Sequence, residues 1–283
     1  MTILLTGANG FIGSYFQRHY TSKYQFKTFS FSQHTLNELI LDDVEIILHL
    51  AAIVHRPSTQ EEEYMQVNVQ KTFKFAQKAK KSGVKQFVFI STIAVYDPKL
   101  SCIKENSLLK PETLYGKSKL EAEKQLQSLE NESFKVSIVR PPMVYGHNAP
   151  GNIHNLMNLL NKMPILPFGN IANQRSFVYV GNLCAMIDCI IQSKSYGIFL
   201  ASDDSPLSTT RLIELISNVK NKKIYLLYVK GFGRFLKWFK PSLYQRLFEN
   251  LEIDNTQTKQ TLCFKNPYST EEGIRLMIQG EDK

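Results

Sequence analysis

The sequence predicts an α/β protein, a doubly wound parallel sheet of Rossmann type with a smaller C-terminal lobe. Short apolar runs that suit buried strands alternate with longer amphipathic segments that suit helices. A glycine-rich turn joins the first of these runs to the first helix. With 283 residues, the chain is long enough to bury a sizeable core in one or two lobes.

The expected strands and helices of the first half follow one another in β-α-β order. The segment between the second and third strands is too short for the usual helical crossover, so we expect a truncated connection there. The strands are expected at residues 2–6, 26–31, 44–50, 86–90 and 136–139, and the helices at residues 11–20, 61–81 and 113–130.

The turn after the first strand reads TGANGFIG at residues 6–13, with Gly7, Gly10 and Gly13 at every third position. Glycines permit a tight turn and let backbone N–H groups approach a pyrophosphate, whose charge the helix N-terminus stabilises. Because the turn lies directly between a strand and a helix, it predicts a dinucleotide site rather than an ordinary connection.

The end of the second strand bears on the choice between NAD and NADP. NAD sites usually carry Asp or Glu there to bind the ribose hydroxyls, whereas residues 28–33 read TFSFSQ and contain no acid. A missing carboxylate removes repulsion against a 2′-phosphate. Lys27 and His34 lie nearby, but no Arg follows. The sequence therefore leaves NADP and NAD both open and slightly favours NADPH.

Regular alternation ends after residue 142, where glycine, proline and asparagine crowd residues 146–170. We therefore expect a dinucleotide-binding domain at residues 1–140 and a mainly substrate-binding lobe at residues 141–283. In this second part we expect two helices and a strand that returns to the sheet, at residues 153–162, 182–192 and 198–201.

Tyr115 and Lys119 lie four residues apart in an expected helix and so share one face. An ammonium beside a phenol favours the phenolate and brings the tyrosine pKa toward the range of an acid–base catalyst. Ser91 and Thr92 follow the strand at 86–90, at the sheet edge where doubly wound sheets bind ligands. Together these features favour a catalytic site over surface residues and a helix cap.

Several segments together resemble the extended short-chain dehydrogenase/reductase superfamily, and within it the NAD-dependent epimerase/dehydratase group that acts on nucleotide sugars. The resemblance covers nearly the whole chain. The segments are TGANGFIG (6–13), HLAA (49–52), VNVQKT (67–72), FVFISTIAVY (87–96), YGKSK (115–119), VRPPMVYG (139–146), RSFVYVGNL (175–183) and EEGIRLM (271–277).

This resemblance implies a role for each matching residue. It implies that Tyr115 is the catalytic acid–base and that Lys119 holds the nicotinamide ribose and lowers the tyrosine pKa. Thr92 would bind the C4 oxygen of the sugar, and Arg175 the UDP diphosphate. The implied substrate contacts are Ser91, Thr92, Tyr115, Asn152 and Arg175. The implied cofactor contacts are Gly7, Asn9, Gly10, Phe11, Ile12, Gly13, Leu50, Ala51, Ala52, Asn68, Ser91, Tyr115, Lys119, Pro141 and Pro142.

Softer motifs indicate a subgroup. Residues 51–58, 151–160 and 166–180 resemble bacterial capsule and O-antigen enzymes. Those enzymes reduce the 4-keto group of UDP-2-acetamido-2,6-dideoxy-4-hexulose to UDP-N-acetylfucosamine or UDP-N-acetylquinovosamine. The resemblance implies an NAD(P)H-dependent 4-ketoreductase with a UDP-sugar substrate. His55 could reach the sugar or be an ordinary loop residue.

Two alternatives stay open. A UDP-sugar 4-epimerase with tightly bound NAD would use the same three residues, and a non-catalytic dinucleotide-binding protein is the less favoured reading. A 4,6-dehydratase is not expected, because Ile93 and Ala94 stand where such enzymes carry the Asp-Glu pair that eliminates water. Met143 replaces an Asn of the family's motif, which weakens one expected sugar contact.

Composition excludes several other classes. Cys102, Cys184, Cys189 and Cys263 show no CxxC spacing, and the six histidines form no cluster with them, so we expect neither a metal site nor a disulfide framework. Apolar runs are too short to span a membrane, and the glycine turn follows too early for a signal peptide. We therefore expect a cytoplasmic enzyme.

The net charge of +9 is concentrated in one segment: eight bases and no acid lie between Glu214 and Glu249. Because the charge is local and no nucleic-acid motif appears, we expect no nucleic-acid partner. Residues 220–248 interleave aromatic and basic side chains, which leaves open a peripheral contact with an anionic membrane. A helix pair packed on the substrate lobe is the favoured alternative. The sequence also leaves a homodimer open.

Overall fold

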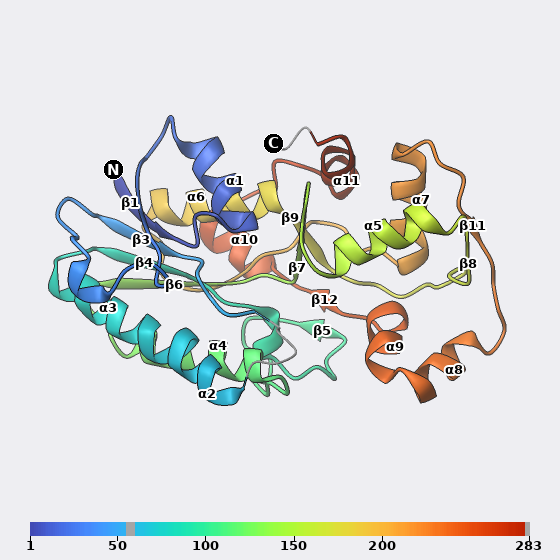
Figure 1. Ribbon diagram of the computed structural model, residues 1–283, viewed down its shortest axis with the longest axis horizontal. Helices are drawn as coiled ribbons and strands as arrows, with labels where there is room; N and C mark the ends of the chain where they lie inside the picture. The colour runs from blue at the N-terminus through green and yellow to red at the C-terminus, as the bar shows by residue number, and fades with distance from the viewer. Residues whose placement is uncertain (55–59, 281–283) are drawn as a thin grey trace.

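The structure is a computed structural model that describes residues 1–54 and 60–280. At its centre lies a six-stranded parallel sheet with the order β10-β6-β4-β3-β1-β2 (Figure 1). The expected doubly wound α/β fold is therefore confirmed. The strands are β1 (Thr2–Thr6), β2 (Gln25–Phe29), β3 (Ile46–His49), β4 (Gln86–Ile90), β6 (Lys135–Arg140) and β10 (Gly197–Leu200).

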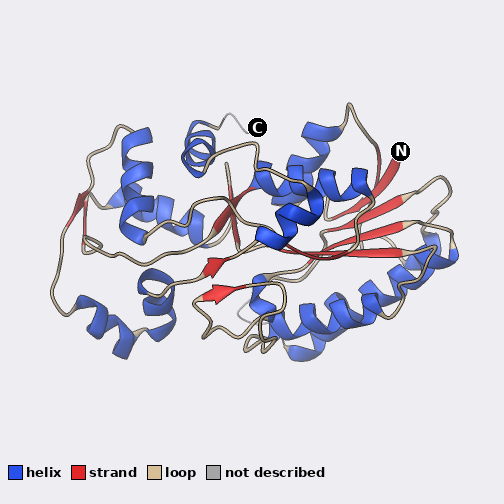
Figure 2. Cartoon of the chain, turned by 180° about the vertical axis from the view of Figure 1, so that it is seen from behind, coloured by secondary structure: helices blue, strands red, loops and turns tan. Residues whose placement is uncertain are grey.

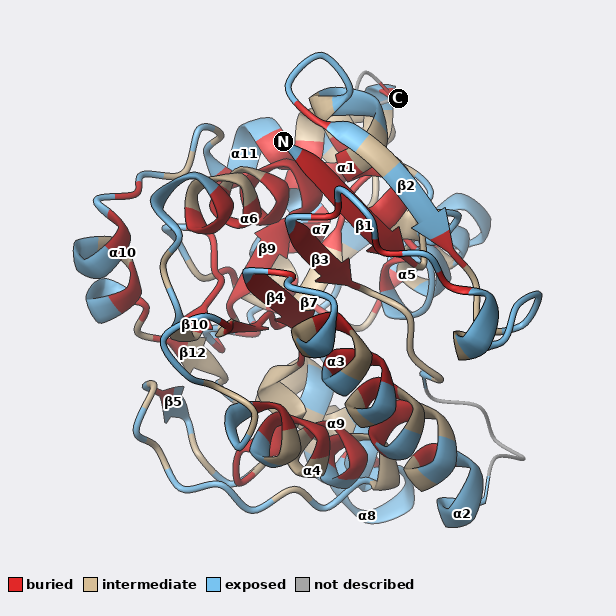
Figure 3. Ribbon diagram, turned by 90° about the vertical axis from the view of Figure 1, so that its left-hand side faces the viewer, coloured by how far each residue is buried: buried red, intermediate tan, exposed pale blue. Residues whose placement is uncertain are grey.

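Helices cover both faces of this sheet, and the buried strands lie between them (Figure 3). Successive strand residues point to opposite faces: Ile3 and Leu5 join the core under α1 and α6, whereas Leu4 joins the core under α3 and α4. Since both faces are covered, the central strands β1, β3 and β4 are buried along their whole length, whereas most of the edge strand β2 is exposed. The covering helices are α1 (Phe11–Tyr20) and α6 (Val180–Ser193) on one face, and α3 (Thr72–Lys81) and α4 (Leu114–Gln127) on the other.

Two connections on the way to these helices differ from a regular doubly wound fold. Between β2 and β3 the chain forms only a 3₁₀ turn at Leu36–Glu38, as the short segment predicts. The expected helix at 61–81 is helical throughout, but it consists of α2 (Glu61–Tyr64), a π-helical stretch at Met65–Lys71 and then α3. The residue pattern gave no sign of the π-helical stretch, and such stretches often mark functional sites.

After β6, the chain forms a second, smaller lobe beyond the ends of the strands (Figures 1 and 2). Two short parallel pairs, β7 with β9 and β8 with β11, organise its strands. They are β7 (Met143–Tyr145), β8 (Ile165–Leu166), β9 (Phe177–Tyr179) and β11 (Tyr225–Leu226). Its helices are α5 (Asn152–Lys162), α7 (Thr209–Val219), α8 (Phe232–Phe239) and α9 (Pro241–Phe248).

The chain crosses between the lobes several times. Besides β10, the last segment returns to the first lobe, where β12 pairs with β5 in parallel. The remaining elements are β5 (Cys102–Ile103), β12 (Glu252–Ile253), α10 (Thr256–Leu262) and α11 (Thr270–Gln279). None of the helices described is long and apolar enough to cross a membrane.

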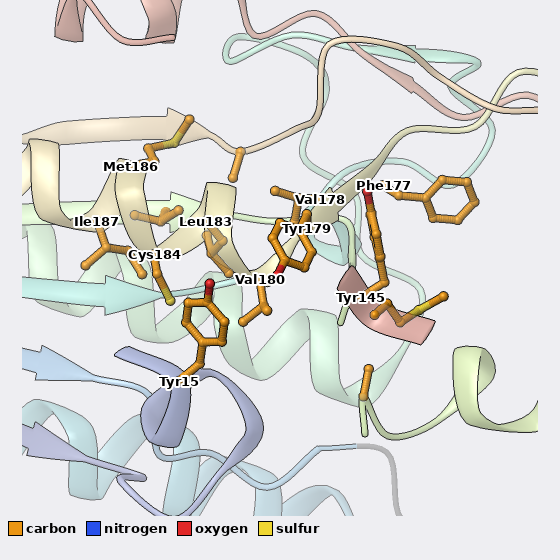
Figure 4. Close-up of a cluster of buried hydrophobic side chains, with 14 of the residues drawn as sticks. Tyr15, Tyr145, Phe177, Val178, Tyr179, Val180, Leu183, Cys184, Met186 and Ile187 are labelled. Carbon is orange, nitrogen blue, oxygen red and sulfur yellow. The ribbon is translucent and has the colours of Figure 1, made fainter. Parts of the chain in front are cut away.

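A buried cluster joins the two lobes where β9 runs into α6. Figure 4 shows Tyr15 of α1 directed toward the side chains of this junction, and its ring meets that of Tyr179 edge to face at 6.4 Å. At the same junction, the hydroxyl of Tyr145 donates to Asp203 Oδ2 at 2.6 Å, and Asn182 Nδ2 donates to Asp203 Oδ1 at 2.7 Å. Because every one of these polar groups is buried and paired, the junction holds the two lobes in one arrangement.

Candidate active site

The glycine turn is packed so tightly that side chains could not replace two of its glycines. Gly7 has a φ of +72°, and a Cβ on it would lie 3.0 Å from the backbone N of Ala51. A Cβ on Gly13 would lie 2.3 Å from the carbonyl oxygen of Gly7. The turn therefore places the start of α1 directly against the end of β3.

The first turn of α1 leaves its backbone donors available. Gly10 caps the helix without a side-chain hydrogen bond, and both Asn9 and Gly10 are exposed. Phe11 and Ile12 are the first residues of the helix, with side chains that pack on the core. A helix start with uncapped backbone N–H groups, which a ligand can approach closely, suits the pyrophosphate of a dinucleotide.

The strand ends beside the turn are fixed by a buried histidine that sequence reasoning did not assign. His49 Nδ1 lies 2.8 Å from Thr6 Oγ1, and His49 Nε2 lies 3.1 Å from Thr72 Oγ1. Thr6 Oγ1 also accepts from the N–H of Ala51 at 3.2 Å. Burial, with Lys119 as a second cause, lowers the pKa of His49 to about 3. A neutral imidazole thus holds the chain at Leu50, Ala51 and Ala52.

Asn68, in the π-helical stretch, ties the segment after β3 to α4. Its Oδ1 accepts from the N–H of Ile53 at 2.8 Å, while its Nδ2 donates to Ile53 O at 3.0 Å and to Ser118 Oγ at 3.1 Å. Ser118 Oγ in turn donates to the carbonyl of Tyr115 at 2.9 Å. The amide of Asn68 is therefore engaged in positioning the helix that carries Tyr115.

The structure brings the start of α4 against the loop that follows β4. A Cβ on Gly116 would lie 2.3 Å from the carbonyl oxygen of Ala94, so only glycine allows this contact. In the same loop, Thr92 is partly exposed, and its Oγ1 accepts from the N–H of Ala94 at 3.2 Å. Tyr115 and Thr92 are thereby placed on facing segments.

Ser91 and the Pro141–Pro142 segment complete this edge of the sheet. The hydroxyl of Ser91 is buried and has no hydrogen-bond partner among the residues described. Its N–H donates to Val139 O at 2.8 Å, and the carbonyl of Pro141 accepts from the N–H of Ile93 at 3.1 Å. The prolines therefore lie next to the loop that carries Thr92.

Lys119 is buried one turn after Tyr115, with its ammonium nitrogen 4.1 Å from the centre of the Phe89 ring. Burial lowers its pKa to about 7, and Glu123 opposes this shift. Burial is the main cause that raises the pKa of Tyr115 to about 12, and the neighbouring Tyr64 is the second cause. The tyrosine pKa is therefore raised and not lowered as expected, because both groups lose water and both charged forms are disfavoured.

Two adjoining cavities extend from this edge into the second lobe. One, of about 270 Å³, is lined by Ala94 and Thr113 beside the loop and the start of α4. The other, of about 390 Å³, is lined by Pro142, Met143 and apolar side chains of α5 and α9. Arg175 lines both cavities, so together they form one groove with a basic middle.

Two arginines provide the positive charge of this groove. Arg175 Nη1 donates to the carbonyls of Gln245 at 3.1 Å and Glu249 at 3.0 Å, which fixes it to the end of α9. Arg246, which also lines both cavities, donates to Asn152 Oδ1 at 3.2 Å. The expected residues Arg175 and Asn152 are thus brought together, and Arg246 joins them. Sequence reasoning treated Arg246 only as part of the basic segment.

Ser30 Oγ and Ser32 Oγ lie 2.9 Å apart just after β2, the position without an acid. His55 lies outside the residues described, as do residues 56–59. Among residues 1–54 and 60–280, no group of three His, Cys, Asp or Glu side chains is placed to hold a metal ion.

Comparisons with known proteins agree with this arrangement. Residues 3–200 match the NAD dependent epimerase/dehydratase family. The chain is 34% identical to the UDP-glucose 4-epimerase of Vibrio cholerae over an alignment of 312 residues, which covers 98% of this chain and 94% of the relative. It is 28% identical to the N-acetyl-alpha-D-glucosaminyl-diphospho-ditrans,octacis-undecaprenol 4-epimerase of Escherichia coli O157:H7, over 78% of this chain and 73% of that one.

Solved structures share the fold. The UDP-glucuronic acid 4-epimerase of Bacillus cereus in complex with NAD has a TM-score of 0.81 at 19% identity, over 99% of this chain and 96% of its own. A human epimerase family protein with NADPH has a TM-score of 0.79 at 14% identity, over 99% of both chains. Proteins that bind NAD and proteins that bind NADPH therefore share this fold.

Proposed function

Because the chain belongs to the NAD dependent epimerase/dehydratase family, we propose that this NAD(P)-dependent enzyme inverts C4 of a sugar carried on a diphosphate. UDP-sugars are the proposed substrate class. The observation that carries the proposal is the likeness to a UDP-glucose 4-epimerase over 98% of the chain. The groove supports it, because one end is lined by Ala94 and Thr113, two residues from Thr92 and Tyr115 in the chain, and Arg175 and Arg246 line its middle.

In the proposed reaction, Tyr115 takes the proton of the C4 hydroxyl while the C4–H bond breaks and its hydride leaves. Thr92 binds the C4 oxygen and keeps it facing Tyr115. The 4-keto sugar then rotates so that its other face is presented. The hydride returns to C4 from that opposite face, and Tyr115 gives the proton back to the C4 oxygen. Bound NAD(P) supplies the hydride exchange, so nothing is consumed over a full cycle.

Residues around the pair have supporting roles in this proposal. Lys119 would hold the ribose beside Tyr115. In its protonated form, Lys119 would also favour the phenolate form of Tyr115. Asn68 and His49 would act as positioning residues. Asn68 would position α4 through Ser118, and His49 would position the end of β3 through Thr6. Arg175 and Arg246 would bind the diphosphate, and this remote binding would orient the sugar ring at Tyr115.

A 4-ketoreductase is the second candidate, and two observations favour it. Residues 28–33, at and after the end of the β2 edge strand, offer the hydroxyls of Ser30 and Ser32 but no carboxylate. This edge would accept the 2′-phosphate of NADPH, the cofactor that a reductase consumes. A tyrosine with a pKa of about 12 is also in the acid form that reduction of a ketone needs.

An assay with the purified protein separates the two reactions. UDP-glucose, UDP-N-acetylglucosamine and N-acetylglucosaminyl-diphospho-undecaprenol would be incubated with the enzyme and its cofactor, and the products identified by NMR. An epimerase converts one of these to its C4 epimer without net change in reduced nicotinamide. Stoichiometric loss of NADPH with a UDP-4-keto-6-deoxy sugar would identify the reductase instead.

A variant pair tests the catalytic assignment. Tyr115→Phe should reduce turnover by at least about 10²-fold, because phenylalanine has no hydroxyl to accept the proton from the sugar and give it back. Tyr196→Phe removes a hydroxyl from an exposed tyrosine before β10 and serves as the matched control. Equal turnover of the two variants would contradict the role of Tyr115. Cofactor binding without turnover of any substrate would indicate a non-catalytic protein.

A further inference from the structure

The outward face of α8 carries three exposed aromatic side chains that touch one another. Phe235 and Phe239 have ring centres 4.6 Å apart, and Trp238 lies 4.9 Å from Phe239. Trp238 is 83% exposed, and the other two rings are more than half exposed. We refer to these three residues as the α8 aromatic face.

The opposite side of α8 already supplies the contacts that hold the helix in place. Leu236 is buried, and the ring of Phe232 packs against Phe168 and Phe248 at 6.2 and 6.3 Å. The helix is therefore folded onto its lobe without using the α8 aromatic face. Figures 1 and 2 show α8 at the outer end of the second lobe, away from the sheet.

Positive charge surrounds the α8 aromatic face. Lys230, Arg234, Lys237 and Lys240 are all exposed. Lys230 and Arg234 also line an open cavity of about 570 Å³ at the start of α8. Because no acid lies between Glu214 and Glu249, nothing in this segment neutralises these bases.

We propose that the α8 aromatic face and its four surrounding bases dock the enzyme on the surface of an anionic lipid bilayer. Aromatic side chains are suited to the interface between headgroups and acyl chains, and nearby bases are attracted to anionic headgroups.

Charge argues against a second copy of this chain as the partner. A twofold interface centred on α8 would bring the same four bases of two subunits face to face, without acids to pair with them. An anionic surface reverses this repulsion into attraction. The bilayer also provides an apolar layer for Trp238 and its neighbours.

The docking surface is connected to the groove through α9. Residues Leu243, Arg246 and Leu247 of α9 line the cavity of about 390 Å³. A bilayer that contacts α8 would therefore hold the mouth of the groove close to the membrane surface. This geometry does not depend on the proposed reaction, since it concerns only the face opposite the packed side of α8.

The experiment uses the full chain and its single tryptophan, Trp238. Vesicles of phosphatidylcholine with and without phosphatidylglycerol are mixed with the protein, which is then sedimented, while tryptophan emission is recorded. Sedimentation and a blue-shifted emission with the anionic vesicles only, reversed by high salt, are expected. Absence of both, or equal binding to neutral vesicles, would overturn the proposal.

Variants separate the surface from the fold. The triple variant Phe235→Ser, Trp238→Ser and Phe239→Ser should weaken vesicle binding by at least about tenfold. A second variant, in which Gln replaces Lys230, Arg234, Lys237 and Lys240, should weaken it as much. Gln at Lys74, Lys81, Lys85 and Lys124, exposed in the first lobe, removes equal charge and should leave binding unchanged. All of these variants should turn over a soluble UDP-sugar at the wild-type rate. A negative vesicle test therefore contradicts only the membrane proposal, and an inactive wild-type enzyme contradicts only the proposed function.

The oligomeric state provides the last readout. Sedimentation velocity of the wild type and the aromatic triple variant is expected to give the same mass. If the triple variant instead dissociates a dimer and neither protein binds vesicles, the α8 aromatic face is a subunit interface and the membrane proposal is wrong.

Discussion

The guanidinium of Arg140 binds both oxygens of the Glu123 carboxylate: Nε donates to Oε1 at 3.0 Å and Nη2 donates to Oε2 at 2.6 Å. Both side chains are buried, and the third nitrogen of Arg140 donates to the hydroxyl of Tyr96 at 2.6 Å. Because Glu123 lies one turn after Lys119 in α4, the pair fixes the buried face of the helix that carries the proposed catalytic residues.

Removing one partner of this pair should be costly. Glu123→Gln leaves the charge of Arg140 buried without its counter-ion, so we expect the free energy of unfolding to fall by about 3–5 kcal/mol. Urea denaturation measures it. Glu121→Gln, on the same helix but not buried, should change it by less than about 0.5 kcal/mol. If Glu123→Gln were equally mild, the pair would not be what holds this face of α4.

Replacing both partners should cost less than replacing one. Glu123→Leu combined with Arg140→Met removes both charges from the interior, and packing can then recover much of the loss. A double variant less stable than Glu123→Gln would show that the hydrogen bond to Tyr96, rather than the ion pair, dominates.

Lys119 should make stability depend on pH in the neutral to alkaline range. Its pKa is about 7 in the folded chain, against about 10.4 when unfolded. Between these values the unfolded chain binds more protons, so the free energy of unfolding rises with pH, by up to about 1.4 kcal/mol per unit. Below about pH 7 the cost of burying the ammonium is fully present.

A pair of variants isolates this slope. Urea denaturation at several pH values should give a flatter profile for Lys119→Met than for the wild type, whereas Lys117→Met, at an exposed position, should retain the slope. The raised pKa of Tyr115 acts only above about pH 10 and does not interfere. Parallel profiles for Lys119→Met and wild type would contradict the lowered lysine pKa.

Gly13 should tolerate no side chain. A Cβ at this position would lie 2.3 Å from the carbonyl oxygen of Gly7, so Gly13→Ala must displace the turn. We expect a loss of about 1–3 kcal/mol in stability and at least about tenfold weaker NAD binding by calorimetry. Gly233→Ala, where the nearest atom is a Phe248 ring carbon at 3.3 Å, is the control. Unchanged NAD affinity in Gly13→Ala would place the dinucleotide elsewhere.

The sequence could predict those features that depend on local pattern. Apolar runs and the glycine turn identify the strands of the sheet and the start of α1, because burial on both faces and backbone approach leave direct marks on residue type. The helical spacing of Tyr115 and Lys119 places them on α4. Parallel topology places Thr92 at the carboxyl edge of the sheet, whereas its approach to the start of α4 depends on the contact between Gly116 and Ala94.

Features that depend on contacts between distant segments could not be predicted. His49 gains its two threonine partners from β1 and α3, and Arg246 reaches Asn152 across 94 positions of the chain. The tyrosine pKa was expected to fall, whereas burial raises it. Burial of that kind is set by how α4 packs on the sheet, and the spacing of two residues does not reveal it.

Arg246 offers the sharpest test of where the diphosphate binds. Its side chain is exposed at the groove and hydrogen-bonded to Asn152, so Arg246→Gln removes a charge without opening the core. A charge-assisted contact contributes about 1.5–3 kcal/mol, so KM for the UDP-sugar should rise about 10–100-fold. Because the diphosphate is remote from C4, kcat should change little. Arg211→Gln, which removes an exposed arginine paired with Glu214 on α7, should alter neither constant. A KM equal to that of wild type would exclude Arg246 from the diphosphate site and leave Arg175 as its proposed cation.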